Sequence, residues 1–495
     1  MNSPSPKTLG ALKASGWQSR TVKEELRQNL ISRLKNKETG FHGIYGYEET
    51  VIPELERAIL SKHNINLLGL RGQAKTRLAR LMVQLLDEWM PCIEGTELND
   101  DPLNPISRTG QDLIDKMGDE TPVVWMHRND RYTEKLATPD VTVADLIGDV
   151  DPIKAASLKL PYSDERVIHY GLIPRSHRCI FVINELPDLQ ARIQVALFNI
   201  LQEGDIQIRG FKLRLPLDIQ FVFTANPEDY TNRGSIVTPL KDRIDSQIIT
   251  HYPASIETGK KITRQEAVIQ SGQTSVLIPE LARDLIEQVA MEARHSEFVD
   301  GKSGVSARLT ISAFENLMST AERRMLLNGE PDTTLRMTDL YGIIPAITGK
   351  VELVYEGEQE GAGIVARNLI GKAIRTLFTQ YFPDPEKSKK QKEGSVFLPV
   401  SAYFEEGRSI QLLTESPEET YRQILDAIPE MDDLLFDSSL SILPAERHFW
   451  KEFILFGLAE FSIISKKVLE SETRFSDLLS SMINLDEMEF DDDDA

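Results

Sequence analysis

The stretch from Asn66 to Arg80 constrains the fold of this chain more than any other. It reads Asn-Leu-Leu-Gly-Leu-Arg-Gly-Gln-Ala-Lys-Thr-Arg-Leu-Ala-Arg, an apolar run followed by a glycine-punctuated turn, a Lys-Thr pair and an amphipathic helix start. A turn of this kind lets several backbone N–H groups converge on a phosphate. We therefore expect a strand, a phosphate-binding loop and a helix. The loop residues expected to contact a nucleotide are Gly69, Gly72, Gln73, Ala74, Lys75 and Thr76.

Each polar residue of this loop has a separate expected role. The ammonium of Lys75 would reach the terminal phosphates as a point charge, and the hydroxyl of Thr76 would ligate Mg²⁺. Ala74 stands where a glycine usually precedes the lysine, and a positive φ there would cost on the order of 1 kcal/mol. The alternative is an ordinary glycine-containing turn between a strand and a helix.

Composition and charge limit the classes of function. The chain has 495 residues, 41% of them hydrophobic and 27% charged, which suits a soluble protein of roughly three domains. A formal net charge of -21 argues against a direct grip on nucleic acid or on a membrane surface. Two cysteines give no disulfide framework, and no apolar stretch has the length of a signal peptide or a membrane span. We expect a cytoplasmic protein.

Polar residues follow two further apolar runs. The run from Cys179 ends in Asn184 and Glu185, and the run from Phe221 ends in Asn226. Glu185 is a candidate base for a water that attacks a phosphate, and Asn226 could hold that water from the other side. Asn184 would be a neutral Mg²⁺ ligand where an aspartate is usual, which should weaken the contact. Each of these residues could instead belong to a simple turn at the end of a strand.

Alternating strand and helix patterns predict an α/β fold with a mostly parallel five-stranded sheet, with ligands at the carboxyl ends of its strands. Besides the strand before the loop, we expect strands at 121–126, 178–184, 219–225 and 247–251. Between two predicted helices, the loop 40–46 contains Tyr45 and Gly46, which could hold an adenine ring or simply connect the helices. After about residue 263 the pattern becomes helical.

The predicted domain boundaries follow these changes of pattern. We expect an N-terminal helical extension, a nucleotide-binding domain, a helical lid, a charged linker, a mainly helical region and an acidic disordered tail. In that order they cover residues 1–40, 41–255, 256–382, 383–394, 395–484 and 485–495.

The motifs together resemble a known family. The segments 69–76, 179–185, 197–204, 224–227 and 238–244 are similar in order and spacing to the AAA+ ATPases of the helix-2-insert clade, in particular the MoxR-type ATPases and the ATPase subunit of magnesium chelatase. The resemblance covers about residues 41 to 350 and implies an αβα sandwich followed by a helical lid. It also implies that Asn226 is sensor 1, Arg243 an arginine finger and Arg308 sensor 2. A salt bridge to Asp242 or Asp245 is the structural alternative for Arg243.

This resemblance implies an ATP- and Mg²⁺-dependent ATPase that forms a homo-oligomeric ring, with six subunits expected. Its substrate would be a partner protein complex that it remodels or matures, or a partner with a von Willebrand-type metal-binding domain. One alternative is the motor subunit of a magnesium or related metal chelatase. A second is a nucleotide-binding scaffold with little turnover, which Ala74 and Asn184 suggest.

Overall fold

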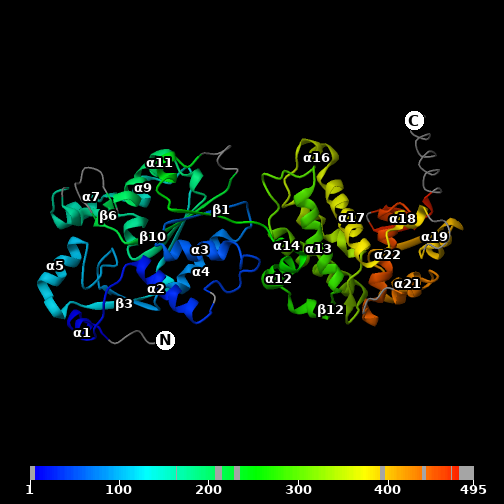
Figure 1. The fold of residues 1–495 in the computed structure, drawn as a ribbon, viewed down its shortest axis with the longest axis horizontal. Helices are drawn as coiled ribbons and strands as arrows, with labels where there is room; N and C mark the ends of the chain where they lie inside the picture. The colour runs from blue at the N-terminus through cyan, green and yellow to red at the C-terminus, as the bar shows by residue number, and fades with distance from the viewer. Residues whose placement is uncertain are drawn as a thin grey trace. The chain divides into compact units, whose positions relative to one another are not determined.

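The structure is a computed structural model that forms two compact units, Met1–His251 and Tyr252–Ala495 (Figure 1). The part of the chain that it describes comprises residues 6–38, 40–162, 164–203, 205–206, 215–227, 235–390, 396–437, 442–469 and 471–478. The predicted acidic tail and the end of the predicted linker lie outside the described residues. The sequence pattern around Gly210 also predicts a hairpin over 206–215, and most of that segment lies outside them too.

A five-stranded parallel sheet forms the centre of the first unit. Its strands, in spatial order, are β11 (Ser246–Ile249), β1 (Ile65–Leu68), β10 (Ile219–Ala225), β7 (Cys179–Asn184) and β4 (Tyr132–Leu136). The chain leaves β1 for the far edge at β4, returns through β7 and β10, and then passes β1 to reach β11. The carboxyl end of β1 is therefore a topological switch point, where open α/β sheets bind ligands. The predicted α/β class is confirmed.

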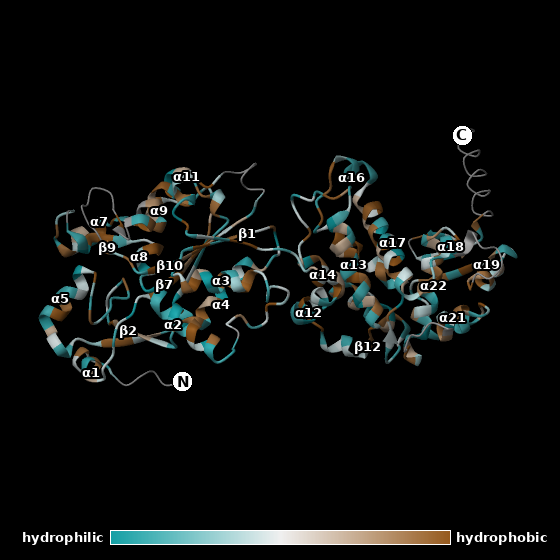
Figure 2. Ribbon diagram, in the orientation of Figure 1, coloured by the Kyte–Doolittle hydropathy of each residue, from teal (hydrophilic) through white to brown (hydrophobic). Residues whose placement is uncertain are grey.

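Helices cover both faces of this sheet, because alternate strand residues point to opposite sides. Ile180 and Val182 of β7 join a core with α2 (Val22–Lys35) and α3 (Val51–Leu60), whereas Phe181 and Ile183 join the core on the other face with α9 (Ala191–Glu203). Figure 2 shows the apolar residues concentrated along these strands. Fully buried strands account for the continuous apolar runs of the sequence.

One predicted strand does not belong to the central sheet. Residues 121–126 do not join the central sheet: β3 (Val123–His127) pairs antiparallel with β2 (Trp89–Ile93) in a separate ribbon. The fifth strand of the central sheet is β4, which the pattern did not predict because its sequence, Tyr-Thr-Glu-Lys-Leu, carries two charges in five residues. This edge strand has a neighbour on one side only, so it tolerates polar side chains.

The sequence pattern predicts frayed residues from 1 to 20 and a helix from Arg77 to about Met90, and both expectations need correction. Leu9–Ala14 forms α1 with Leu9 and Leu12 buried, although residues 1 to 20 were expected to be frayed. The helix α4 runs only from Lys75 to Leu81, continues as a 3-10 turn to Leu85, and does not reach Met90. The chain straightens there because Trp89 begins β2.

The first unit contains further short elements outside the central sheet. They are α5 (Arg108–Met117), α6 (Val143–Leu146), β5 (Gly148–Val150), α7 (Pro152–Leu158), β6 (Ile168–Tyr170), α8 (Leu172–Arg175), β8 (Asp205–Ile206), β9 (Leu215–Pro216) and α11 (Thr238–Lys241).

The second unit is mainly helical. Its helices are α12 (Ile256–Glu266), α13 (Glu280–His295), α14 (Arg308–Asn328), α15 (Ile344–Thr348), α16 (Tyr355–Glu360), α17 (Ala362–Tyr381), α18 (Pro385–Lys390), α19 (Leu398–Glu405), α20 (Glu418–Asp426), α21 (Met431–Asp437) and α22 (Arg447–Glu460). Apolar residues recur at helical spacing over 278–293, 312–327 and 364–381, and the helices that this pattern predicts match α13, α14 and α17. The helix α18 lies inside the predicted linker, because its charged residues also favour a helix.

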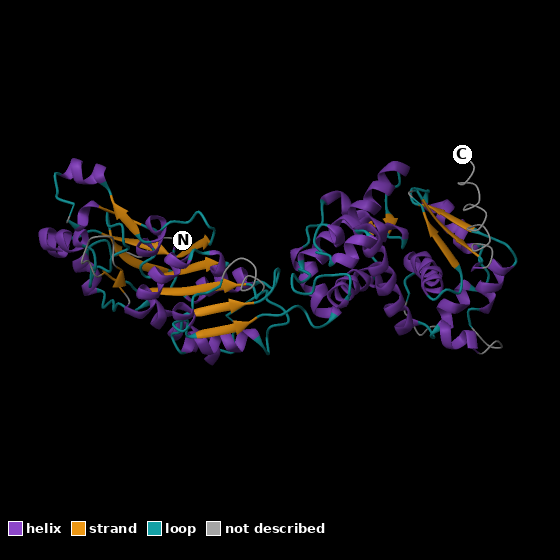
Figure 3. Ribbon diagram, turned by 90° about the horizontal axis from the view of Figure 1, so that it is seen from above, coloured by secondary structure: helices purple, strands orange, loops and turns teal. Residues whose placement is uncertain are grey.

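The region 395–484, which was predicted to be mainly helical, also contains a sheet. The strands β14 (Ile410–Leu413), β16 (Glu472–Ser476) and β15 (Ser465–Val468) form an antiparallel three-stranded sheet (Figure 3), and β12 (Val276–Leu277) pairs with β13 (Thr333–Thr334). One hydrophobic core extends from Val276 to Phe475, so the last region and the predicted lid share their packing.

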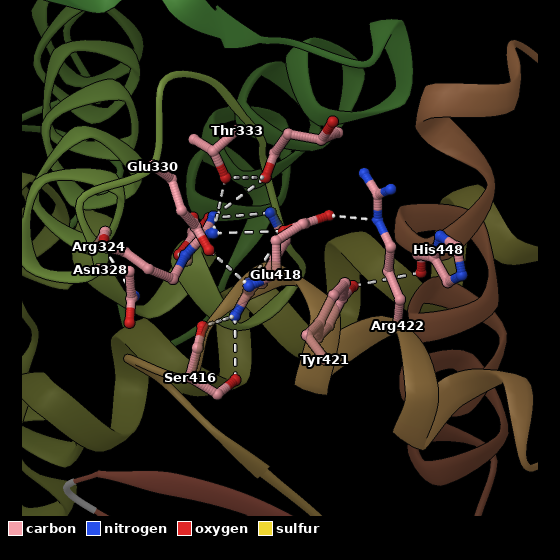
Figure 4. A network of polar contacts seen from close by, with 12 residues as sticks. Arg324, Asn328, Glu330, Thr333, Ser416, Glu418, Tyr421, Arg422 and His448 are labelled. Atoms are coloured by element: carbon pink, nitrogen blue, oxygen red, sulfur yellow. Dashed lines mark hydrogen bonds and ion pairs between the residues drawn. The ribbon is translucent and has the colours of Figure 1, made fainter.

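A buried polar network joins these two parts of the second unit (Figure 4). Arg324 of α14 pairs with Asp339 at 2.9 Å, and Arg336 pairs with Glu418 of α20 at 2.9 Å. The guanidinium of Arg336 also lies 4.1 Å from the ring centre of Tyr421. Arg324 also lies 3.7 Å from Glu418, so this network ties α20 to α14. Removing one partner of such a buried pair typically costs about 3–5 kcal/mol. The domain boundary predicted between them remains a prediction.

Candidate functional site

The loop after β1 contains two residues in the left-handed region. Gly72 and Ala74 both have positive φ, at 72° and 56°, and α4 begins directly afterwards. A Cβ on Gly69 would lie 1.9 Å from Thr250 Oγ1 and 2.2 Å from Gln73 Oε1, so this position has room only for glycine. The left-handed conformation at Ala74 is the one for which the sequence analysis expected a cost.

Lys75 and Gln73 are held by groups at the base of the loop. The Lys75 ammonium contacts the carbonyl oxygen of Gly69 and donates to that of Leu70 at 2.9 Å. The buried carboxamide of Gln73 accepts a hydrogen bond from Thr250 Oγ1 at 2.8 Å. Thr250 directly follows β11, so this contact fixes the loop against the edge strand. Lys75 is thus held within the loop itself by these two backbone carbonyls, and its contact with a phosphate remains a prediction.

The loop and the central strands meet at Asn184, the last residue of β7. Its Oδ1 accepts hydrogen bonds from Thr76 Oγ1 at 3.3 Å and from Thr224 Oγ1 at 3.1 Å. The structure therefore brings Thr76 and Asn184 together, as expected for two ligands of one ion. A hydroxyl and a carboxamide oxygen are hard ligands of the kind that Mg²⁺ accepts, and Mg²⁺ commonly takes few protein ligands together with substrate phosphates.

The two residues that follow these strands lie at the same edge. Glu185 has φ 57° and ψ 49°, is exposed, and donates its backbone N–H to Thr224 Oγ1 at 3.1 Å. Asn226 directly follows β10 and is 9% exposed. A glutamate in the left-handed region costs on the order of 1–3 kcal/mol and is typical of functional sites. Their roles toward water remain predictions.

The sequence analysis did not identify Glu134 of β4. The Asn184 Nδ2 donates to Glu134 Oε1 at 2.6 Å, and Glu134 Oε2 accepts hydrogen bonds from Arg80 Nη2 at 2.9 Å and Tyr132 OH at 3.0 Å. Burial next to Glu134 raises the pKa of Tyr132, so this phenol stays a donor. The polar sequence of β4 could have revealed Glu134, had the strand been recognised.

A tyrosine other than Tyr45 reaches the loop. Tyr45 is 37% exposed, whereas Tyr47 is buried, with its hydroxyl 2.9 Å from the carbonyl oxygen of Gln73 and 2.7 Å from that of His251. Tyr47 thereby connects the segment after Gly46 to the phosphate-binding loop and to the end of the first unit. Contact of Tyr45 and Gly46 with an adenine remains a prediction.

The two arginines taken from the family resemblance lie in different units. Arg243 pairs with Asp242 at 2.6 Å, donates to Gln202 Oε1 at 3.3 Å and lies 4.6 Å from the ring centre of Phe198. The local salt bridge that was the alternative for Arg243 is thus formed within the single chain. Arg308 is the exposed first residue of α14 in the second unit. Both family roles remain predictions.

The two cysteines of the chain are buried in the first unit. Burial raises the pKa of Cys92 to about 11 and that of Cys179 to about 12, so neither thiol is a ready nucleophile. No group of three or more His, Cys, Asp or Glu residues within the described ranges could hold a metal ion. Across the same ranges, no helix has the length and apolar content needed to span a bilayer.

Comparison with known proteins gives low similarity. A scan against protein-family models finds no match. The chain is similar to magnesium chelatase, in a BchI–BchD complex, at 18% identity and a TM-score of 0.34 over 65% of this chain and 98% of that chain. It is similar to NtrX from Brucella abortus at 14% identity and a TM-score of 0.37, over 84% of this chain and 72% of that chain. It is also similar to Hsp104, in a structure with ATPγS and casein, at 13% identity and a TM-score of 0.38 over 70% of this chain and 55% of that chain.

Proposed function

We propose that this chain is an AAA+ ATPase that binds ATP with Mg²⁺ and hydrolyses it in an oligomeric ring. One observation carries the proposal: Thr76, which follows the loop lysine, lies 3.3 Å from Asn184 at the carboxyl end of β7. This contact supports the proposal because it joins the hydroxyl that follows the loop lysine to the amide at the carboxyl end of β7, at the switch point of the sheet. The low structural similarities to known proteins add nothing to this reasoning.

Each residue at this edge has a role in the proposed reaction. The loop amides and Lys75 would bind the phosphates, and Thr76 and Asn184 would hold Mg²⁺, which supplies charge neutralisation on the phosphoryl oxygens. Glu185 would orient the attacking water and accept its proton on the carboxylate, and Asn226 would hold that water. Arg243 would act on the nucleotide of a neighbouring subunit, which requires it to leave Asp242 on assembly.

The downstream role that we propose is the remodelling or maturation of a partner protein complex. The chelatase motor is an alternative within the same chemistry. A scaffold that binds nucleotide with little turnover is the second candidate, and two observations favour it: the left-handed Ala74 and the neutral Asn184.

The proposal is tested by measuring steady-state ATP turnover together with particle mass, with and without ATP and Mg²⁺. We expect Mg²⁺-dependent turnover that accompanies assembly. Lys75→Ala and Arg243→Ala chains, each inactive alone, should regain partial activity when mixed, since some interfaces then pair an intact loop with an intact arginine. Nucleotide binding without turnover in any assembly would support the scaffold instead. Mixed rings without recovery would leave Arg243 as a structural residue.

A further inference from the structure

The orientation of the Asn184 side chain is fixed by Glu134. A carboxylate group that accepts hydrogen bonds can face only the Nδ2 end of the amide, which lies 2.6 Å from Glu134 Oε1. The Oδ1 end then faces the hydroxyls of Thr76 and Thr224, at 3.3 and 3.1 Å. Asn184 is 8% exposed, so water competes little for these contacts. Glu134 therefore determines that Asn184 presents an oxygen, and not an NH₂ group, toward Thr76.

Glu134 is itself held in place by its second oxygen. Glu134 Oε2 accepts hydrogen bonds from Arg80 Nε at 3.1 Å and Nη2 at 2.9 Å, and from Tyr132 OH at 3.0 Å. Arg80 lies on α4, the helix that the phosphate-binding loop leads into. The carboxylate of Glu134 thus connects this helix to Asn184 at the end of β7.

An aspartate at position 184 would not fit this arrangement. Its second oxygen would replace Nδ2, 2.6 Å from Glu134 Oε1, and bring two carboxylates into contact without a donor between them. Like charges at this separation repel strongly in a partly buried place. The neutral residue at 184 and the carboxylate at 134 are therefore complementary, and the negative charge missing from β7 is present on β4.

We propose that Glu134 is a positioning residue of the nucleotide site, which orients the Asn184 oxygen and supplies from β4 the negative charge that a magnesium ligand at position 184 lacks. This inference rests on the proposed ATPase function. Partners in the outer shell of a metal site typically change metal affinity by about 10- to 100-fold when they are lost. The sequence departure at Asn184 would then be a relocation of charge, and not a loss of the magnesium site.

The test is a double-mutant cycle of the full chain with Glu134→Gln, Asn184→Asp and both together. For each variant, the Mg²⁺ midpoint of binding of a fluorescent ATP analogue is measured, together with the thermal midpoint of the nucleotide-free protein. We expect each single change to raise the Mg²⁺ midpoint by at least about 10-fold. In the double variant the amide introduced on β4 can donate to the carboxylate introduced on β7, so both midpoints should return toward the parental values.

Glu120→Gln serves as the control, because it removes one carboxylate from an exposed turn elsewhere in the same unit. It should leave both midpoints unchanged, which separates the pair from a general effect of net charge. A Mg²⁺ midpoint that Asn184→Asp lowers equally with and without the Glu134→Gln change would overturn the inference. Additive effects of the two substitutions on the Mg²⁺ midpoint would also overturn the inference, and they would leave the proposed nucleotide binding intact. Absence of analogue binding by the parental chain would overturn the proposed function and this inference together.

Discussion

Replacing Ala74 with glycine should stabilise the first unit. Ala74 has φ 56° and ψ 18°, a conformation that costs an L-residue with a Cβ about 1–2 kcal/mol relative to the right-handed region. Glycine removes this strain but adds about 0.4–1 kcal/mol of chain entropy to the unfolded state. Mid-range values of about 1.5 and 0.7 kcal/mol leave a net gain of about 0.8 kcal/mol. For a unit of this size, it corresponds to a rise of about 1–4 °C in the melting temperature.

The melting temperature is followed by tryptophan fluorescence, since three of the four tryptophans, Trp17, Trp89 and Trp125, lie in the first unit. Ala156→Gly is the matched control, because Ala156 is exposed within α7 and right-handed helix favours alanine by about 1 kcal/mol. The control should lower the melting temperature. An Ala74→Gly protein that melts at or below the parental temperature would refute the assignment of strain to this loop.

Three further predictions concern the hydroxyl of Tyr47, the carboxylate of Glu185 and the buried imidazole of His177. Tyr47→Phe removes a hydroxyl that contacts two backbone carbonyls, so it should destabilise the first unit by about 1 kcal/mol and weaken nucleotide binding, measured by thermal unfolding and titration. Glu185→Gln should keep nucleotide affinity and slow single-turnover hydrolysis by about 10²- to 10⁴-fold; unchanged hydrolysis would remove Glu185 from the mechanism. Burial, together with the charge of Arg178, lowers the pKa of His177 to about 3. Between pH 6.5 and this value the imidazole is protonated only in the unfolded chain, so the free energy of unfolding decreases as the pH is lowered. Between pH 7 and 5, His177→Asn should therefore lose about 2 kcal/mol less unfolding free energy than the parent in urea titrations; parallel pH profiles would contradict this.

The fold was largely predictable where the strands are buried on both faces. The apolar runs at β7 and β10 and the glycine turn after β1 determine the centre of the sheet and its carboxyl edge. The edge strand β4 was missed because one of its sides has no neighbouring strand, so charged residues such as Glu134 and Lys135 obscure the pattern. The strand assigned to 121–126 was misplaced, since an apolar run does not tell which sheet it joins.

The motif residues of the candidate site were predictable from the sequence, but their contacts with residues outside the motifs were not. Loop, strand-end and spacing signals placed Thr76, Asn184 and Glu185 at one edge, and the structure brings the first two into contact. Tyr47 is 26 residues from Gln73 in the sequence and Glu134 is 50 residues from Asn184, and sequence spacing carries no information on such contacts. For this reason Tyr47 and Glu134 became visible only in the folded chain.

The most direct test of the account is the affinity of the full chain for ATP, compared between the parental protein and Lys75→Ala by titration calorimetry in the presence of Mg²⁺. We expect saturable binding by the parental protein. We expect that binding to be lost in the variant, because Lys75 is the point charge that the loop presents to the terminal phosphates. Lys13→Ala, which removes a lysine of α1 outside the site, should bind like the parent. Equal affinity in the parental and Lys75→Ala proteins, or no binding by either, would contradict the account.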